Sequence, residues 1–275
     1  MKKARVIIGL ILALAFLSAC AHMTENQANV SASPVIDRIL ERGELIVGTA
    51  GSMPPLNMTT KDGKIIGIEV DLARYMAKSM GVKLRLETMP FAKLLPALEA
   101  GKVDMILSGM TIIPERNLKV AFVGPYFISG KAFLTKIETI ASAADAAEID
   151  DPNITLAALK GSTSQLFVEA NIPRAKLVAT ENYDEAVDLV IQGKVDALVA
   201  DYAICLISPL RYPDEGLMTV VTPLTYEPIG IALPANDPLL VNWVDNILIM
   251  LKGSGELKEL QDYWFKDVSW LKELK

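Results

Sequence analysis

The sequence predicts an α/β protein made of two similar lobes that face each other across a ligand cleft. Three observations lead to this class. The 275 residues are 51% hydrophobic and 22% charged, enough for a full core. A strand–helix–strand unit occurs twice, and each copy follows a strand that runs into a glycine turn. Alternating strands and helices favour parallel sheets, whose ligands bind outside the carboxyl ends of the strands.

The repeated unit covers residues 83–109 and 176–201. Each copy is predicted as a strand, a helix, the residues Gly-Lys-Val-Asp and a second strand, over 83–87, 91–100, 101–104 and 105–107, and again over 176–179, 183–192, 193–196 and 197–200. The glycine after each helix suits a C-terminal cap with positive φ, and the apolar run after Val-Asp suits a buried parallel strand.

Other elements fit between these units. We predict strands over 45–47 and 154–159, each leading into a glycine turn, and a helix that begins at Gln165. A helix over 69–80 carries Val70, Leu72, Ala73, Met76, Ala77 and Met80 at helical spacing, so we assign its methionines to the core.

The first twenty residues are typical of a targeting signal. Three basic residues precede an apolar run over 6–17, which has the length of a secretory signal and is shorter than a membrane span. Leu17-Ser18-Ala19-Cys20 resembles a bacterial lipobox. We expect residues 1–19 to be removed, Cys20 to carry the lipid, and residues 20–34 to form a tether. The alternative is an ordinary signal peptide that happens to contain Cys20.

Composition excludes several classes of function. The net charge of −6 argues against nucleic acid as a partner. One histidine, His22, and two cysteines cannot build a His-rich metal site, a zinc ribbon or a histidine-based serine hydrolase, so we expect no metal and no cofactor. Cys205 lies in an apolar stretch and is predicted to fill the core.

Polar residues gather where the predicted strands end. Residues 49–53, 90–91, 108–111, 116, 162–164 and 201 include one guanidinium, one carboxylate, hydroxyls and glycine-freed amides. The fork of Arg116 can bind a carboxylate, helped by the amides of the turn at 161–164, and Asp201 suits an ammonium. An α-amino acid has that arrangement of charges.

Each of these residues also has a purely structural explanation. Arg116 follows a Pro-Glu turn and could be a surface arginine. Asp201 follows a strand and could be a helix N-cap, and Ser162 and Thr163 could likewise only cap a helix.

Several motifs, in order, resemble a known family. They are Gly-Glu-Leu-Ile-Val-Gly-Thr at 43–49, Gly-Ile-Glu-Val-Asp-Leu-Ala at 67–73, Ser-Gly-Met-Thr at 108–111 with Pro-Glu-Arg at 114–116, Phe-Val-Gly-Pro-Tyr at 122–126, and Gly-Ser-Thr at 161–163. Over residues 38 to 267 the chain is similar to family 3 extracytoplasmic solute-binding proteins, the amino-acid receptors of ABC importers. The resemblance implies a type II periplasmic binding fold, with two lobes joined by two crossing strands, near 131–136 and 226–233. We therefore expect lobe one over 35–133 and 227–275, and lobe two over 134–226.

The same resemblance implies a role for each site residue. Arg116 would hold the ligand α-carboxylate together with the amides of Thr111 and Thr163. The ammonium would meet Asp201, the Thr111 hydroxyl and the Gly109 carbonyl. Ser108 and Ser162, at the ends of the predicted strands, are further candidates for ligand binding.

Departures from the family pattern bear on the ligand side chain. Phe91 matches the position of an aromatic residue over that side chain. Ala50 and Met53, however, replace the usual acidic and aromatic residues, and Leu56 stands where Phe is usual. We therefore expect a ligand with a neutral or apolar side chain.

Two other functions are alternatives to an amino-acid receptor. Some relatives resemble dehydratases that carry an acid after the turn at 161–164, where this chain has Gln165, although Asp201 or Glu69 could serve as the acid. A sensor subunit would need a separate membrane partner, since the chain stops at Lys275 without a further domain. We expect a monomeric binding protein rather than an enzyme, held by lipid outside the cytoplasm and working with an inner-membrane ABC permease. A dicarboxylate or an opine-like compound is an alternative ligand, since it could use Arg116 with the serine and threonine cluster.

Overall fold

The computed structural model describes residues 32–220 and 223–274. The predicted signal peptide, Cys20 and the tether up to residue 31 lie outside these described residues. The described part begins at the end of that tether, where Pro34 starts the first helix.

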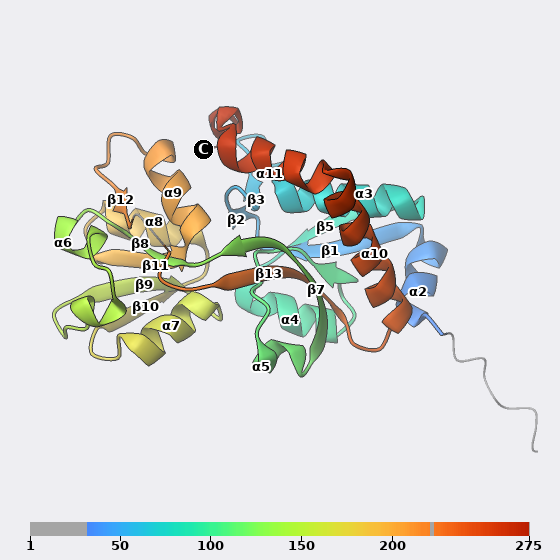
Figure 1. The fold of residues 1–275 in the computed structure, drawn as a ribbon, viewed down its shortest axis with the longest axis horizontal. Helices are drawn as coiled ribbons and strands as arrows, with labels where there is room; N and C mark the ends of the chain where they lie inside the picture. The colour runs from blue at the N-terminus through green and yellow to red at the C-terminus, as the bar shows by residue number, and fades with distance from the viewer. Residues whose placement is uncertain (1–31, 221–222, 275) are drawn as a thin grey trace, which may run out of the picture.

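The first lobe is built on a five-stranded sheet in the order β5-β1-β6-β13-β7, on the right in Figure 1. Its strands are β1 (Glu44–Thr49), β5 (Lys83–Thr88), β6 (Met105–Ile106), β7 (Val120–Ser129) and β13 (Glu227–Pro234). Strand β1 is parallel to β5 and β6, while β13 is antiparallel to β6 and β7. A small sheet of β2 (Ser52–Met53), β3 (Asn57–Thr59) and β4 (Ile65–Ile66) belongs to the same lobe.

The second lobe has its own five-stranded sheet in the order β10-β9-β11-β8-β12. Its strands are β8 (Lys131–Thr135), β9 (Thr155–Leu159), β10 (Lys176–Thr180), β11 (Ala197–Asp201) and β12 (Met218–Thr219). Strand β9 is parallel to β10 and β11, and β8 is antiparallel to β11. The predicted two-lobed α/β class is therefore confirmed.

Helices cover the sheets of each lobe (Figure 1). Those of the first lobe are α2 (Pro34–Arg42), α3 (Ile68–Met80), α4 (Phe91–Glu99), α5 (Pro114–Asn117), α10 (Pro238–Ser254), α11 (Glu256–Lys266) and η2 (Ser269–Glu273). Those of the second lobe are α6 (Glu138–Ala141), η1 (Ala146–Ile149), α7 (Thr163–Asn171), α8 (Tyr183–Ile191) and α9 (Tyr202–Arg211). No helix within the described ranges is both long and apolar enough to span a bilayer.

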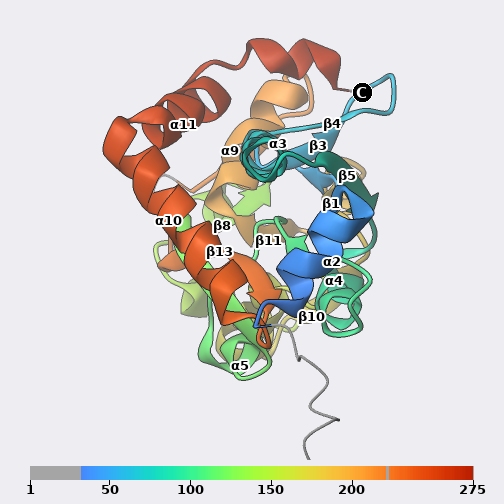
Figure 2. The same cartoon turned by 90° about the vertical axis from the view of Figure 1, so that its right-hand side faces the viewer.

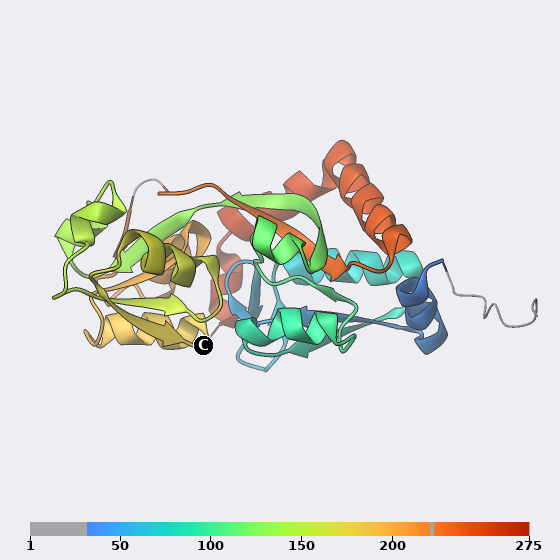
Figure 3. The same ribbon diagram turned by 90° about the horizontal axis from the view of Figure 1, so that it is seen from below.

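Two segments of chain pass between the lobes. Only Gly130 separates β7 from β8, and β13 runs alongside in the opposite direction, with Glu227 paired to Ser129 (Figure 3). A Cβ at Gly130 would lie 2.2 Å from the carbonyl oxygen of Thr225, so this crossing requires glycine. The first lobe thus contains sequence from both ends of the described chain.

The repeated units fold as predicted to within one residue at each boundary, whereas a helix outside them starts earlier than predicted. Gly101 and Gly193 follow their helices at φ +67° and +65°, as the caps require. Helix α7 begins at Thr163 rather than at Gln165. The reason is that the Ser162 side chain accepts hydrogen bonds from the amides of Ser164 and Gln165, which caps the helix earlier.

A polar anchor joins the beginning of the fold to its C-terminal helices. Asp237 is buried and caps α10 by accepting from the Leu240 amide at 2.9 Å. It also accepts from the Ser33 hydroxyl at 2.8 Å and the Val35 amide at 2.8 Å, which holds the start of α2 beside the start of α10 (Figure 2). Burial alone would raise the pKa of Asp237, but these hydrogen bonds outweigh it and lower the pKa.

Apolar side chains fill both lobes. The middle strands β1, β6, β9 and β11 are buried along most of their length, as expected for strands covered on both faces. Met76 and Cys205 are fully buried, in agreement with their predicted core positions, and burial raises the pKa of the Cys205 thiol. Met80 is only partly buried at the end of its helix.

Candidate functional site

Arg116 lies between the two lobes. Its side chain comes from α5, which starts at Pro114, and only 8% of the residue is exposed. Nη1 donates to the carbonyl of Thr111 at 2.9 Å, and Nη2 donates across the cleft to the carbonyl of Gly161 at 3.2 Å. The guanidinium also lies 5.6 Å from the ring centre of Phe91. Arg116 is therefore not a surface arginine, and burial lowers its pKa.

Hydroxyl groups continue the contact between the lobes. The Thr111 Oγ1 atom of the first lobe is 3.1 Å from Thr163 Oγ1 of the second. Thr163 Oγ1 also donates to Glu227 Oε2 at 3.1 Å. A Cβ on Gly161 would lie 3.1 Å from the Cβ of Ala92, so the backbones of the lobes approach closely here. Thr163 therefore does more than begin a helix, whereas Ser162 acts as a helix cap.

Asp201 occupies the N-cap position of α9, but its side chain makes no capping hydrogen bond. Instead, Oδ1 accepts from Lys131 Nζ at 3.1 Å, and Oδ2 lies 3.5 Å from the hydroxyl of Tyr183. Asp201 thus occupies the N-cap position that its place after a strand suggests, but its carboxylate does not cap the helix and instead contacts the buried ammonium of Lys131.

Lys131 and Glu227, to which the sequence motifs assign no role, pair with the candidate site residues Asp201 and Thr163. The Lys131 side chain has no exposed surface, and its Nζ lies 3.1 Å from Asp201 and 3.4 Å from Glu227. Both come from the strands that cross between the lobes, β8 and β13. The available signal is a lone charge next to an apolar strand segment, as in Lys131 before Ala-Phe-Leu. Buried charges of this kind are rare unless they are paired.

The loop after β6 is held by polar contacts within the first lobe. Ser108 Oγ accepts from the Ala50 amide at 2.9 Å, so its hydroxyl fixes the turn after β1. Gly109 has φ +58°, and a Cβ there would lie 2.5 Å from the Met53 Cε atom. Met53 therefore covers Gly109, and Met53 and Leu56 are both almost fully buried.

Glu69 anchors this loop from below. It is the second residue of α3, has 1% exposure, and its Oε1 accepts from the Gly109 amide at 2.6 Å and from the Tyr126 hydroxyl. Its Oε2 accepts from the Asn57 amide nitrogen, and Asn57 Oδ1 in turn accepts from the Gly51 amide at 2.7 Å. Burial raises the pKa of Glu69, although these donors partly oppose the shift. Three donors and no acceptor face this carboxyl, an arrangement that suits a carboxylate.

Gln165 does not face the cleft as a reactive group would. Its Oε1 accepts from the Gly161 amide at 2.8 Å, and its Nε2 donates to Glu169 at 2.8 Å. The side chain thus forms local hydrogen bonds at the start of its own helix.

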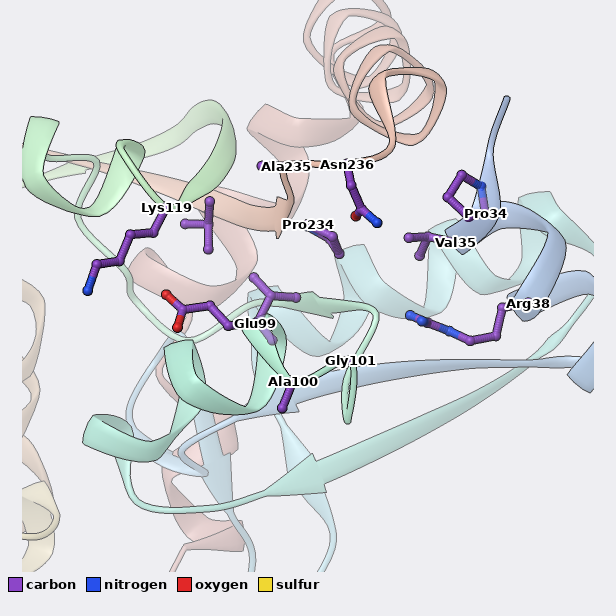
Figure 4. Close-up of a pocket in the computed structure, with 12 residues that line it drawn as sticks. Pro34, Val35, Arg38, Glu99, Ala100, Gly101, Lys119, Pro234, Ala235 and Asn236 are labelled. Atoms are coloured by element: carbon purple, nitrogen blue, oxygen red, sulfur yellow. The ribbon is translucent and has the colours of Figure 1, made fainter. Parts of the chain in front are cut away.

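The cavities differ in how they relate to these residues. One of about 340 Å³ has walls from both lobes, including Arg116 and Ala92 on one side and Gly161 and Leu166 on the other. Another of about 430 Å³ lies wholly on the first lobe, with Arg38 and Lys119 on opposite sides (Figure 4). It contains none of the predicted site residues. Within residues 32–220 and 223–274 no cluster of His, Cys, Asp and Glu could hold a metal ion.

Comparison with known proteins gives a consistent picture. The model of bacterial extracellular solute-binding proteins, family 3, matches residues 45–267. A cyclohexadienyl dehydratase of Pseudomonas aeruginosa is 26% identical over 248 residues, covering 90% of this chain and 92% of the relative. The ABC transporter arginine-binding protein 1 of Escherichia coli is 27% identical over 221 residues, covering 79% and 89%.

Solved structures agree with these matches. An ancestral amino-acid-binding protein, described as a precursor of cyclohexadienyl dehydratase, has a TM-score of 0.77 at 35% identity, covering 84% of this chain and 99% of that one. A putative ABC transporter binding component from Wolinella succinogenes, solved with lysine, has a TM-score of 0.79 at 38% identity over 84% and 99%.

Proposed function

The chain belongs to the family 3 bacterial extracellular solute-binding proteins, and on that premise we propose that it captures a small amino acid outside the cytoplasm and delivers it to an ABC importer. Relatives named for arginine, cystine and glutamine binding support this class of ligand. The site residues proposed for it are those gathered in the cleft.

One observation carries the proposal: a buried guanidinium contacts both lobes at the strand ends. Arg116 donates to Thr111 of one lobe and Gly161 of the other, and three of its five N–H groups are not used by these two bonds. A ligand α-carboxylate can take the remaining donors together with the amides of Thr111 and Thr163. The ammonium would then lie toward Asp201, the Thr111 hydroxyl and the Gly109 carbonyl.

Such a site drives closure of the lobes. A ligand bound by groups from both lobes gains contacts in the closed form that it lacks in the open form, and this difference in affinity shifts the population toward closure. The closed form is the state that a permease partner would recognise.

We propose a neutral or apolar ligand side chain. Ala50 brings no charge to the wall of the cleft, and Met53 and Leu56 present buried apolar groups beside Gly109. Phe91 lies next to Arg116, and we propose that its ring covers the ligand side chain. The proposal extends to a monomer anchored through lipid on Cys20, outside the cytoplasm.

The similarity to a dehydratase makes an enzyme the second candidate. Two observations count against it. Gln165 is hydrogen-bonded to Gly161 and to Glu169 of its own helix, and the carboxylates of Asp201 and Glu227 are paired with Lys131 rather than poised to donate a proton. We therefore propose binding without chemistry.

The test is thermal unfolding of the chain from residue 23 against a panel of L-amino acids and small carboxylates. A ligand at about 100 times its Kd adds about 2.7 kcal/mol, which raises Tm by about 5 to 10 °C in a protein of this size. Arg116→Ala should abolish the shift, while Arg174→Ala, at an exposed position in the second lobe, should keep it. Shifts from carboxylates alone would remove the ammonium role of Asp201, and no shift from any compound would contradict the receptor proposal.

A further inference from the structure

The contact between the lobes includes a buried cation that belongs to the protein. Lys131 Nζ contacts Asp201 and Glu227 at 3.1 and 3.4 Å with no exposed surface on its side chain. Glu227 is further fixed by Thr163 at 3.1 Å and by Thr225 at 3.1 Å. The lysine is therefore part of the same polar cluster as the residues proposed to bind ligand.

The charges of Arg116, Lys131, Asp201 and Glu227 balance without any ligand. Arg116 and Lys131 contribute +2, and Asp201 and Glu227 contribute −2, so the sum is zero. Without Lys131 the sum would be −1. Buried charges are unfavourable unless they are balanced, so the lysine decides which ligand charge the closed cleft accepts.

Building on the proposed function, we propose that Lys131 is a specificity-determining residue that excludes amino acids with cationic side chains and selects ligands of zero net charge. Glu227 is the carboxylate that a ligand ammonium or guanidinium could use besides Asp201. Lys131 already contacts both Asp201 and Glu227. A cationic group on the ligand side chain, in addition to the α-ammonium, would find neither carboxylate unpaired and would be repelled by the Lys131 ammonium.

Binding of L-arginine and L-glutamine, measured by titration calorimetry, tests this on wild type and Lys131→Gln. The glutamine side chain introduced at position 131 keeps a hydrogen-bond donor near both carboxylates but removes the positive charge, so the net charge of the cluster becomes −1. We expect wild type to prefer L-glutamine, and the preference to shift toward L-arginine by about 30-fold in Lys131→Gln. That factor corresponds to the repulsion between two unit charges, the Lys131 ammonium and the ligand guanidinium, at about 8 Å in an effective dielectric of about 20.

A double variant separates charge from structure. Lys131→Gln with Glu227→Gln restores a sum of zero, with Arg116 balancing Asp201, and should return the preference to L-glutamine. It also keeps the proposal testable if the single variant does not fold, because a zero-sum cluster without the lysine should fold and prefer L-glutamine. A merely structural lysine would instead weaken both ligands equally in both variants.

The outcomes are distinct. Wild type that prefers L-arginine, or a preference that Lys131→Gln leaves unchanged, overturns the role of Lys131 but keeps the receptor function. If neither compound binds any of the three proteins while other amino acids shift Tm, the selection between these two side chains is refuted. If no amino acid binds at all, the proposed function fails as well.

Discussion

Replacing Glu69 by glutamine should loosen the segment that carries Gly109 while leaving both sheets intact. In the structure the Glu69 carboxyl accepts from the Gly109 amide, the Tyr126 hydroxyl and the Asn57 amide nitrogen. In Glu69→Gln one oxygen can still accept two of these bonds. The new NH₂ group, however, faces the NH₂ group of Asn57, so a buried pair of donors is left without an acceptor.

The size of the effect follows from these contacts. Bonds to a charged acceptor contribute about 1.5 to 3 kcal/mol and bonds to a neutral one about 0.5 to 1.5, so the two retained bonds lose about 2 kcal/mol together. The unsatisfied donor adds about 1 to 3 kcal/mol. Removing a buried charge offsets part of this loss, because burial already raises the pKa of Glu69. We expect a net loss of about 1 to 3 kcal/mol in the free energy of unfolding.

A double-mutant cycle by urea denaturation at pH 8 measures the interaction. Asn57→Asp in the Glu69→Gln background restores a donor facing an acceptor, and the carboxylate introduced by this change can still accept from the Gly51 amide. The double variant should be at least about 2 kcal/mol more stable than the sum of the single effects predicts. Glu99→Gln, at an exposed site, should change stability by less than about 0.5 kcal/mol.

Hydrogen exchange gives a second measure that needs no ligand. The Gly109 amide should exchange faster in Glu69→Gln and recover its protection in the double variant. Additive effects within about 0.5 kcal/mol, together with unchanged exchange at Gly109, would refute the reasoning.

Other predictions concern stability and pH. Gly109 has φ +58° and a Cβ there would lie 2.5 Å from Met53, so Gly109→Ala should cost about 1 to 2 kcal/mol of stability and weaken ligand binding. Gly253 lies inside helix α10 with open space around it, so Gly253→Ala should stabilise the protein by about 0.5 to 1 kcal/mol. Calorimetric melting that gives the two variants the same change in Tm would contradict this prediction. Asp237→Asn should lower the free energy of unfolding by about 2 kcal/mol at pH 7. The folded-state pKa of Asp237 lies below the unfolded value of about 3.9, so the advantage of wild type over the variant should vanish as pH falls through the folded pKa. An equal difference in stability at pH 7 and pH 2 would contradict this prediction. The raised pKa of Glu69 has the opposite effect on stability. Above about pH 4.5 the folded state keeps a proton that the unfolded state releases, so the contribution of Glu69 to the free energy of unfolding falls as pH rises to the folded pKa. Glu69→Gln should remove this pH dependence from the urea midpoints.

Local patterns in the sequence were enough to predict most of the architecture. Both Gly-Lys-Val-Asp segments follow helices and precede buried strands, because a glycine cap and an apolar run act within a few residues of each other. The start of α7 was predicted two residues late, since Ser162 could be read either as a ligand contact or as a cap, and the cap decides where the helix begins.

Nearness in the sequence was enough to group Arg116 with Thr111, and the structure places both at the contact between the lobes. The site was not predictable where partners come from distant strands. Lys131 and Asp201 are 70 residues apart, and the apolar segment after Lys131 indicates a buried strand but does not identify the partner of the lysine. Glu69 belongs to a motif in the sequence, but its grip on Gly109 spans 40 residues and depends on the fold. Pairing between buried charges is a tertiary property.

The order of strands in the first sheet also determines when that sheet can be completed. Strand β13 lies between β6 and β7, and β7 has no other partner in the sheet. During synthesis, β7 must therefore wait for residues 227–234, whereas the second sheet needs only residues 131–219. The second lobe can fold while the first still has a missing strand, and the ligand cleft forms only when almost the whole chain is available. A premature stop before β13 would leave an apolar strand unpaired rather than a smaller receptor.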